Sequence, residues 1–102
     1  SGSGPGFVFN IIDAMEKAAI KLGFNRITSK TIVHQTFKGS INLLLQGNKS
    51  AESLVKTVAT KGGTTEAGLK VMKKNNIHKV FISLVNASYK RAKQQGSNNA
   101  KR

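Results

Sequence analysis

The stretch Lys61-Gly62-Gly63-Thr64-Thr65-Glu66-Ala67-Gly68-Leu69 decides how the rest of the chain is interpreted. The paired glycines allow a tight backbone turn, and a helical pattern begins near Thr64. The first turn of a helix leaves backbone N–H groups unpaired and carries a partial positive charge, which favours bound anions. Threonine hydroxyls and the cation of Lys61 can add to such a site. Residues 60–65 are therefore either an anion-binding loop or an ordinary turn in which Gly63 or Thr64 caps the helix.

Neither glycine-rich segment matches a nucleotide-binding motif. In the central segment Lys61 precedes the glycines, whereas the Walker lysine follows them. The N-terminal Gly2-Ser3-Gly4-Pro5-Gly6 is followed by Phe7, and no strand precedes it, so it is not a dinucleotide fingerprint. We therefore predict no cofactor-binding residue in this chain.

On both sides of the central stretch the apolar residues recur at the intervals of one helical face. The pattern predicts five helices, at about 7–22, 28–46, 51–58, 64–74 and 77–96. Pro5 fits the first turn of the first helix, Gly23 and Gly47 are stop signals, and Ser50 fits as the cap of the third. Three carboxylates also precede a lysine by four positions, an arrangement that favours helix: Asp13 with Lys17, Glu52 with Lys56, and Glu66 with Lys70.

A strand interpretation competes with this one. Residues 31–37 and 80–84 are rich in β-branched or aromatic side chains, and Gly62-Gly63 fits a two-residue hairpin turn. The periodic stretches are longer than typical strands, however, and we predict an all-α fold.

Composition excludes several classes of function. The chain has 102 residues, enough for one domain, and no cysteine, which excludes disulfides, thiolate catalysis and cysteine-bound zinc. His34 and His78 lack metal-ligand spacing, so we expect no metal. No apolar run is long enough to span a membrane, and the apolar start at 7–12 lacks the preceding basic segment of a secretory signal. We expect a cytoplasmic protein with no membrane partner.

Charge and apolar surface both suggest partners. Lys and Arg total 17 against 4 Asp and Glu, a net charge of +13, which suggests anionic ligands, nucleic acid or an anionic surface. The basic residues are spread along the chain, and five of six aromatics are Phe on apolar faces, so we expect no sequence-specific nucleic-acid partner. Five apolar helical faces exceed what one small core can cover, so a protein partner is expected.

The central stretch resembles the Ser-Pro-Gly-Gly-Thr-Thr-x-Ala-Gly-Leu signature of pyrroline-5-carboxylate reductases, which complete proline biosynthesis. The segment 1–7 is similar to the Ser-Gly-Ser-Gly-Pro-Ala-Phe opening of their C-terminal domain. Further matches at the family's spacings are Asp13-Ala14, Lys21-Leu22-Gly23, Gln35-Thr36, Gly39, Ala87 and Lys90-Arg91. Two positions depart from the family: Thr60-Lys61 replaces Ser-Pro, and Asn86 replaces a glutamate common in the last helix.

The resemblance implies a helical dimerisation and substrate-binding domain over residues 1–96, of the 6-phosphogluconate dehydrogenase-like type, followed by a flexible basic tail at 97–102. It implies an interlocked homodimer, or a larger oligomer built from it. The family's NADPH or NADH is bound by a Rossmann domain that precedes this segment, and no βαβ unit occurs here. The full-length enzyme would reduce 1-pyrroline-5-carboxylate to L-proline, whereas this chain alone is expected to bind no cofactor and to be inactive.

For the site, the resemblance implies that a small anionic imine binds through its carboxylate to Thr60, Gly62, Gly63, Thr64 and Thr65. The threonine that matches Thr65 lies close to the imine nitrogen, so Thr65 is the predicted catalytic residue. Two alternatives remain open from the residues alone: a small basic helical nucleic-acid-binding module, and a dimerisation domain without a catalytic role.

Overall fold

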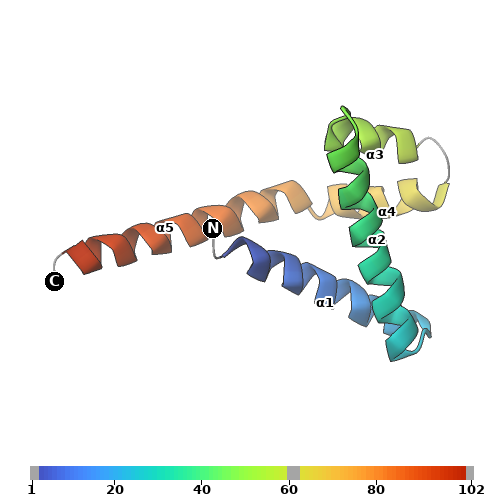
Figure 1. The fold of residues 1–102 in the computed structure, drawn as a ribbon, viewed down its shortest axis with the longest axis horizontal. Coiled ribbons are helices and arrows are strands. Elements are labelled where there is room, and N and C mark those ends of the chain that lie inside the picture. The colour runs from blue at the N-terminus through green and yellow to red at the C-terminus, as the bar shows by residue number, and fades with distance from the viewer. Residues whose placement is uncertain (1–2, 60–62, 101–102) are drawn as a thin grey trace. The chain divides into compact units, whose positions relative to one another are not determined.

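The computed structural model describes the backbone of residues 3–59 and 63–100, and the side chains of 3–59 and 63–96. These described ranges form five helices: α1 (Gly4–Leu22), α2 (Arg26–Gln46), α3 (Ala51–Ala59), α4 (Gly63–Lys74) and α5 (Ile77–Ala100) (Figure 1). The described ranges contain no strand. The all-α prediction is confirmed, and the strand interpretation of 31–37 and 80–84 is wrong, because these residues lie inside α2 and α5.

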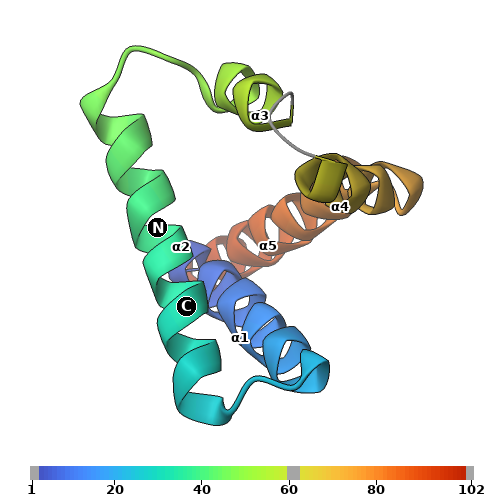
Figure 2. The same ribbon diagram turned by 90° about the vertical axis from the view of Figure 1, so that its right-hand side faces the viewer.

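The chain divides into two compact units, Ser1–Ser53 and Leu54–Arg102. The first unit contains α1, α2 and the start of α3. The second contains the remainder of α3 together with α4 and α5. In the first unit α1 and α2 lie close together at the turn that joins them and diverge away from it, as both views show (Figures 1 and 2).

Glycine ends α1 as its position in the sequence predicted. Gly23 has φ 115, in the left-handed region that side chains rarely enter. Its N–H donates to the carbonyl of Ile20 at 2.9 Å, and the N–H of Phe24 donates to that of Ala19 at 3.2 Å. These bonds satisfy two carbonyls at the end of the helix, as in a Schellman motif. Pro5 lies in the first turn of α1, as predicted.

α2 begins two residues earlier than the sequence pattern suggested, because Asn25 caps it. The Asn25 side chain accepts a hydrogen bond of 2.8 Å from the backbone N–H of Thr28. The capping turn also orients Ser29, whose hydroxyl donates to the Phe24 carbonyl at 3.5 Å. Ser29 and Val33 are the two buried residues of α2, so the covered part of this unit lies beside the turn.

We expect Asn25→Ala to lower the free energy of unfolding by about 1 kcal/mol, the usual value of an asparagine N-cap. Asn25→Asp keeps a side-chain acceptor and should retain most of the stability. Urea denaturation of both variants at one protein concentration measures the difference. Equal stability of Asn25→Ala and the unchanged chain would show that the cap contributes nothing.

The second unit is organised by the turn between α4 and α5. Asn76 has φ 52, and its N–H donates to the Lys73 carbonyl at 3.0 Å. The Asn75 side-chain amide donates to the Val71 carbonyl at 2.9 Å. These asparagines end α4 where the sequence predicted a break. α5 then continues to Ala100, four residues past the predicted end near Gly96, because a single glycine weakens a helix without stopping it.

Local polar pairs support the remaining helix predictions. Ser50 caps α3, its hydroxyl oxygen accepting from the Ser53 N–H at 3.1 Å. Lys17 Nζ lies 2.9 Å from an Asp13 carboxylate oxygen, and Lys70 Nζ lies 3.6 Å from one of Glu66. The hydrogen bond to Asp13, and then the charge of Asp13, raise the pKa of Lys17 above its ordinary 10.5. The Asp13–Lys17 pair therefore contributes fully below pH 10.5 and is lost as the pH rises through the raised pKa.

Candidate functional site

The most prominent feature of both units is apolar surface without cover. Among the described side chains, Val33 is the one buried hydrophobic residue and Ser29 the one buried polar residue. Twenty large hydrophobic side chains are exposed. In the second unit, no described residue is buried. Since folded domains are stabilised mainly by removing apolar surface from water, these helices require another surface against which to pack.

α2 shows how this apolar surface is arranged. One face carries the covered residues Ser29, Val33, Phe37 and Leu44. A second face carries Ile32 and Leu43, which are 42% and 55% exposed, with Gly39 between them. A Cβ added at Gly39 would meet no atom within 4 Å. A glycine inside a helix costs roughly 0.5–1 kcal/mol relative to alanine, and nothing within the chain requires it here. This face therefore suits the close approach of another helix.

The other helices carry similar faces. On α1, Val8, Met15 and Leu22 recur every seven residues, and Leu22 is 82% exposed. On α4, Val71 and Met72 are exposed, as are Val80, Phe81, Ile82 and Val85 on α5. The prediction that the chain has more apolar faces than it can cover is confirmed for the part that the structure describes.

The second candidate feature is the first turn of α4. The helix begins at Gly63, so Gly63 and Thr64 lie within its first turn. The interpretation in which one of them caps the helix is therefore wrong. Gly63 and Thr64 are exposed and Thr65 is partly buried. The predicted site residues Thr60 and Gly62 lie outside the described residues, as does Lys61.

This turn has the chemistry of an anion site. The N–H groups of the first three residues of a helix have no acceptor within it, and here they belong to Gly63, Thr64 and Thr65. The partial positive charge of the helix end adds to their attraction for a carboxylate. Glu66 brings a negative charge to the same turn, and its ion pair with Lys70 offsets that charge. The structure therefore brings together Gly63, Thr64 and Thr65 of the predicted set.

A third feature joins α1 to α2. His34 Nε2 lies 2.6 Å from a Glu16 carboxylate oxygen, and the Glu16 side chain is only 18% exposed. They line a pocket of about 370 Å³ with Phe9, Ile12, Asp13 and Phe37. No local pattern in the sequence indicates that these two residues, 18 positions apart, would meet.

The described residues contain no group of three or more His, Cys, Asp or Glu that could hold a metal ion. None of their helices is both long enough and apolar enough to cross a membrane.

Comparison with known proteins gives a consistent result. The family model for pyrroline-5-carboxylate reductase dimerisation matches residues 1–95. Pyrroline-5-carboxylate reductase 2 of Bacillus subtilis is 40% identical over 92 residues, which are 90% of this chain and 33% of the relative. Pyrroline-5-carboxylate reductase 3 of Xenopus laevis is 34% identical over 96 residues, 94% of this chain and 35% of the relative.

Solved structures extend the likeness to the fold. The pyrroline-5-carboxylate reductase of Coxiella burnetii superposes with a TM-score of 0.84 at 35% identity, covering 90% of this chain and 34% of that one. The Plasmodium falciparum pyrroline carboxylate reductase, solved with NADP bound, superposes with a TM-score of 0.81 at 32% identity. The match covers 85% of this chain and 33% of that one.

Helices whose apolar faces lack a partner within the chain are typical of a helical dimerisation domain. The chain belongs to the pyrroline-5-carboxylate reductase dimerisation family, which confirms the resemblance seen in the glycine-threonine stretch. It spans about a third of the length of the curated relatives it matches.

Proposed function

We propose that this chain forms the homodimerisation and substrate-binding part of a cytoplasmic pyrroline-5-carboxylate reductase, which reduces 1-pyrroline-5-carboxylate to L-proline with NADPH or NADH. The observation that carries the proposal is the uncovered apolar surface on both units of a chain that belongs to this family. The names of the relatives and the NADP in one similar structure support the reaction and the cofactor.

A second copy of the chain is the partner that best fits the apolar faces. An isologous dimer brings the same face from each copy to one interface, so a single set of exposed residues is covered twice. Obligate dimers of this kind resemble a domain core divided between two chains. The single buried hydrophobic residue of the described part is what such a division would leave in each half.

The first turn of α4 is the proposed binding site of the substrate carboxylate. The N–H groups of Gly63, Thr64 and Thr65 would bind its oxygens, with Thr60 and Gly62 completing the loop. Holding the carboxylate at a helix N-terminus fixes the orientation of the imine ring, which lowers the entropic part of the barrier. The residues of this site differ from those of the apolar faces of α1 and α2, so binding and dimerisation can be tested by different substitutions.

The reaction adds a hydride to the imine carbon and a proton to the imine nitrogen. We assign the proton step to the Thr65 hydroxyl, which would donate the proton or relay it from water. NADPH or NADH supplies the hydride when bound. The described residues form helices and offer no strand–turn–helix cradle for a dinucleotide, so we assign that group to a separate nucleotide-binding domain.

If the cofactor is bound by a separate domain, this chain should be inactive alone and active when joined to that domain. The 102-residue chain alone should show no oxidation of NADPH in the presence of 1-pyrroline-5-carboxylate. Joined at its N-terminal side to the nucleotide-binding half of a family member, it should support turnover, followed by the loss of NADPH absorbance. NADPH-dependent turnover by the isolated chain would contradict the proposal, and so would an inactive joined enzyme that is dimeric and binds NADPH.

A further inference from the structure

The positive charge of the chain has no use in the proposed reaction. A small anionic substrate needs one or two cationic groups, whereas the net charge is +13. Four carboxylates face 17 lysines and arginines, and those of Asp13, Glu16 and Glu66 are engaged by Lys17, His34 and Lys70. Most lysines and arginines therefore have no negative side chain available to them.

We propose, beyond the enzymatic function, that α5 carries a surface that binds the phosphate backbone of nucleic acid without sequence preference. We call this surface the α5 basic stripe, made of Lys79, Ser83, Asn86, Lys90 and Lys93. The members follow one another at intervals of four, three, four and three residues, which places them on one face of a helix. All five side chains are exposed.

The stripe lies on the outer side of its unit. The partly covered residues of α5 are Ile77, Leu84 and Ser88, which share one face. At about 3.6 residues per turn, the stripe is centred roughly half a turn away from that face. Packing of α5 through the face of Ile77, Leu84 and Ser88 therefore leaves the basic stripe accessible, with the exposed Ile82 at its edge.

Among the described residues, no carboxylate pairs with the stripe. The whole of α5, Ile77–Ala100, contains neither aspartate nor glutamate. The preceding carboxylate, Glu66 in α4, is engaged with Lys70. A second copy of the chain would bring only the same four carboxylates. Charge complementarity therefore points to an anion other than a second copy of this chain.

The dimensions suit a nucleic-acid backbone. Lys79 and Lys93 are 14 residues apart, about 21 Å along the helix. Over that length one strand of a duplex presents roughly six phosphates at about 3.4 Å spacing. Lysines act as point charges toward phosphate, and serine and asparagine are also common donors to phosphate oxygens.

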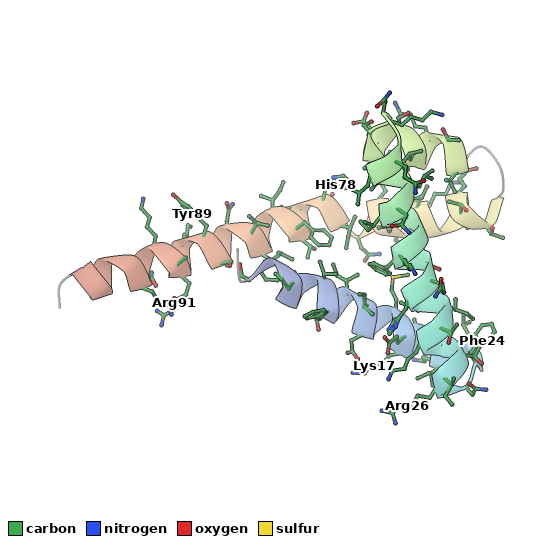
Figure 3. The ribbon with its side chains drawn as sticks, in the orientation of Figure 1. Lys17, Phe24, Arg26, His78, Tyr89 and Arg91 are labelled. Carbon is green, nitrogen blue, oxygen red and sulfur yellow. The ribbon has the colours of Figure 1, made fainter. Side chains whose placement is uncertain are left out.

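Two details at the ends of the stripe support this assignment. At its start, Lys79 and Ser83 line a hollow of about 570 Å³ with Asn75, Asn76, Val80 and Leu84, where amide and hydroxyl donors can meet a phosphate. Near its end, Tyr89 is 65% exposed, and Lys93 Nζ lies 6.0 Å from the centre of its ring. The Tyr89 ring therefore borders the stripe on one side. Arg91 projects from the opposite side of α5 to Tyr89 (Figure 3).

An anionic membrane is the less suitable occupant. A basic helix that lies on a membrane must bury its apolar face among the acyl chains. On α5 that face also carries the exposed Val80, Phe81, Ile82 and Val85, which we assign to packing against a second copy of the chain. A phosphate backbone requires only the polar face and leaves the apolar face free for packing.

The test measures binding of the complete chain to a labelled duplex of about 20 base pairs by fluorescence anisotropy, between about 50 and 200 mM salt. The variant Lys79→Gln/Lys90→Gln/Lys93→Gln removes three charges from the stripe. The matched control Lys30→Gln/Lys38→Gln/Lys49→Gln removes three exposed charges from the first unit. Circular dichroism establishes that both remain helical, and the single variant Lys90→Gln serves if the triple variant does not fold.

We expect the stripe variant to lose at least about tenfold in affinity at low salt, and its plot of log affinity against log salt to flatten by about 0.9 per lost contact, 2.7 in all. The control should change affinity by less than about threefold. Equal losses in both triple variants, or no binding by the unchanged chain at about 100 μM and low salt, would overturn the proposal. Tighter binding to phosphatidylserine vesicles than to the duplex would also overturn it.

Discussion

Leu43→Glu is expected to prevent the chain from forming a stable dimer. Leu43 is 55% exposed and lies with Ile32 and Gly39 on the apolar face of α2 that we assign to the interface. A carboxylate enclosed there without a partner costs several kcal/mol, and each dimer would contain two. A loss of about 4 kcal/mol raises the dissociation constant roughly a thousandfold. Because each unit covers so little apolar surface alone, helical content should fall together with the molar mass.

Asn42→Glu is the matched control. It introduces the same charge at the neighbouring exposed position of α2, outside the face formed by Ile32, Gly39 and Leu43. This variant should remain dimeric and helical at the same concentration. Light scattering gives the mass and circular dichroism the helical content. A dimeric, fully helical Leu43→Glu would show that this face of α2 is not in the interface.

Thr65→Val is expected to lower kcat/KM about ten- to a hundredfold in an enzyme that joins a nucleotide-binding half to this chain. Valine keeps the branched shape of threonine and removes the hydroxyl. A hydrogen bond to a charged group contributes about 1.5–3 kcal/mol, which corresponds to that loss of rate. Thermal stability should change little, because valine fills the same space as the partly buried Thr65 side chain.

Thr65→Ser provides the control, since it retains a hydroxyl at the same position in the first turn of α4. It should keep most of the activity that Thr65→Val loses. The role assigned to Thr65 would be rejected if Thr65→Val were fully active. It would also be rejected if the loss of activity matched a loss of folded protein in thermal melts.

The helices could be predicted from the sequence because their signals are local. Gly23, Ser50 and the Asn75-Asn76 pair act within a turn of the residues that they cap or stop, and each does so in the structure. Asn25 was also a local signal, because its side chain accepts a hydrogen bond from the N–H of Thr28, three residues later. The apolar pattern alone placed the start of α2 too late. Gly96 does not end α5, because it stays within the helix, whereas Gly23 ends α1 by adopting a left-handed φ of 115.

In the candidate site, too, the features set by local signals were predictable and those set by packing were not. The Gly62-Gly63 pair predicted a helix beginning beside Thr64, so the position of Thr65 in the first turn of α4 followed from the sequence. The contact between His34 and Glu16 did not, because it depends on how α1 and α2 pack and links positions 18 residues apart. The exposed apolar faces were predictable as periodic patterns. Which of them a partner covers depends on a second chain, whose contacts no single-chain periodicity encodes.

The molar mass of the folded chain tests the central claim most directly. Light scattering at micromolar concentration should give about 22 kDa, twice the 10.9 kDa of one chain, with a helical circular dichroism spectrum. The midpoint of thermal unfolding should rise with protein concentration, because only the dimer covers the apolar faces. A stable helical species of 10.9 kDa, with a midpoint independent of concentration, would contradict the account.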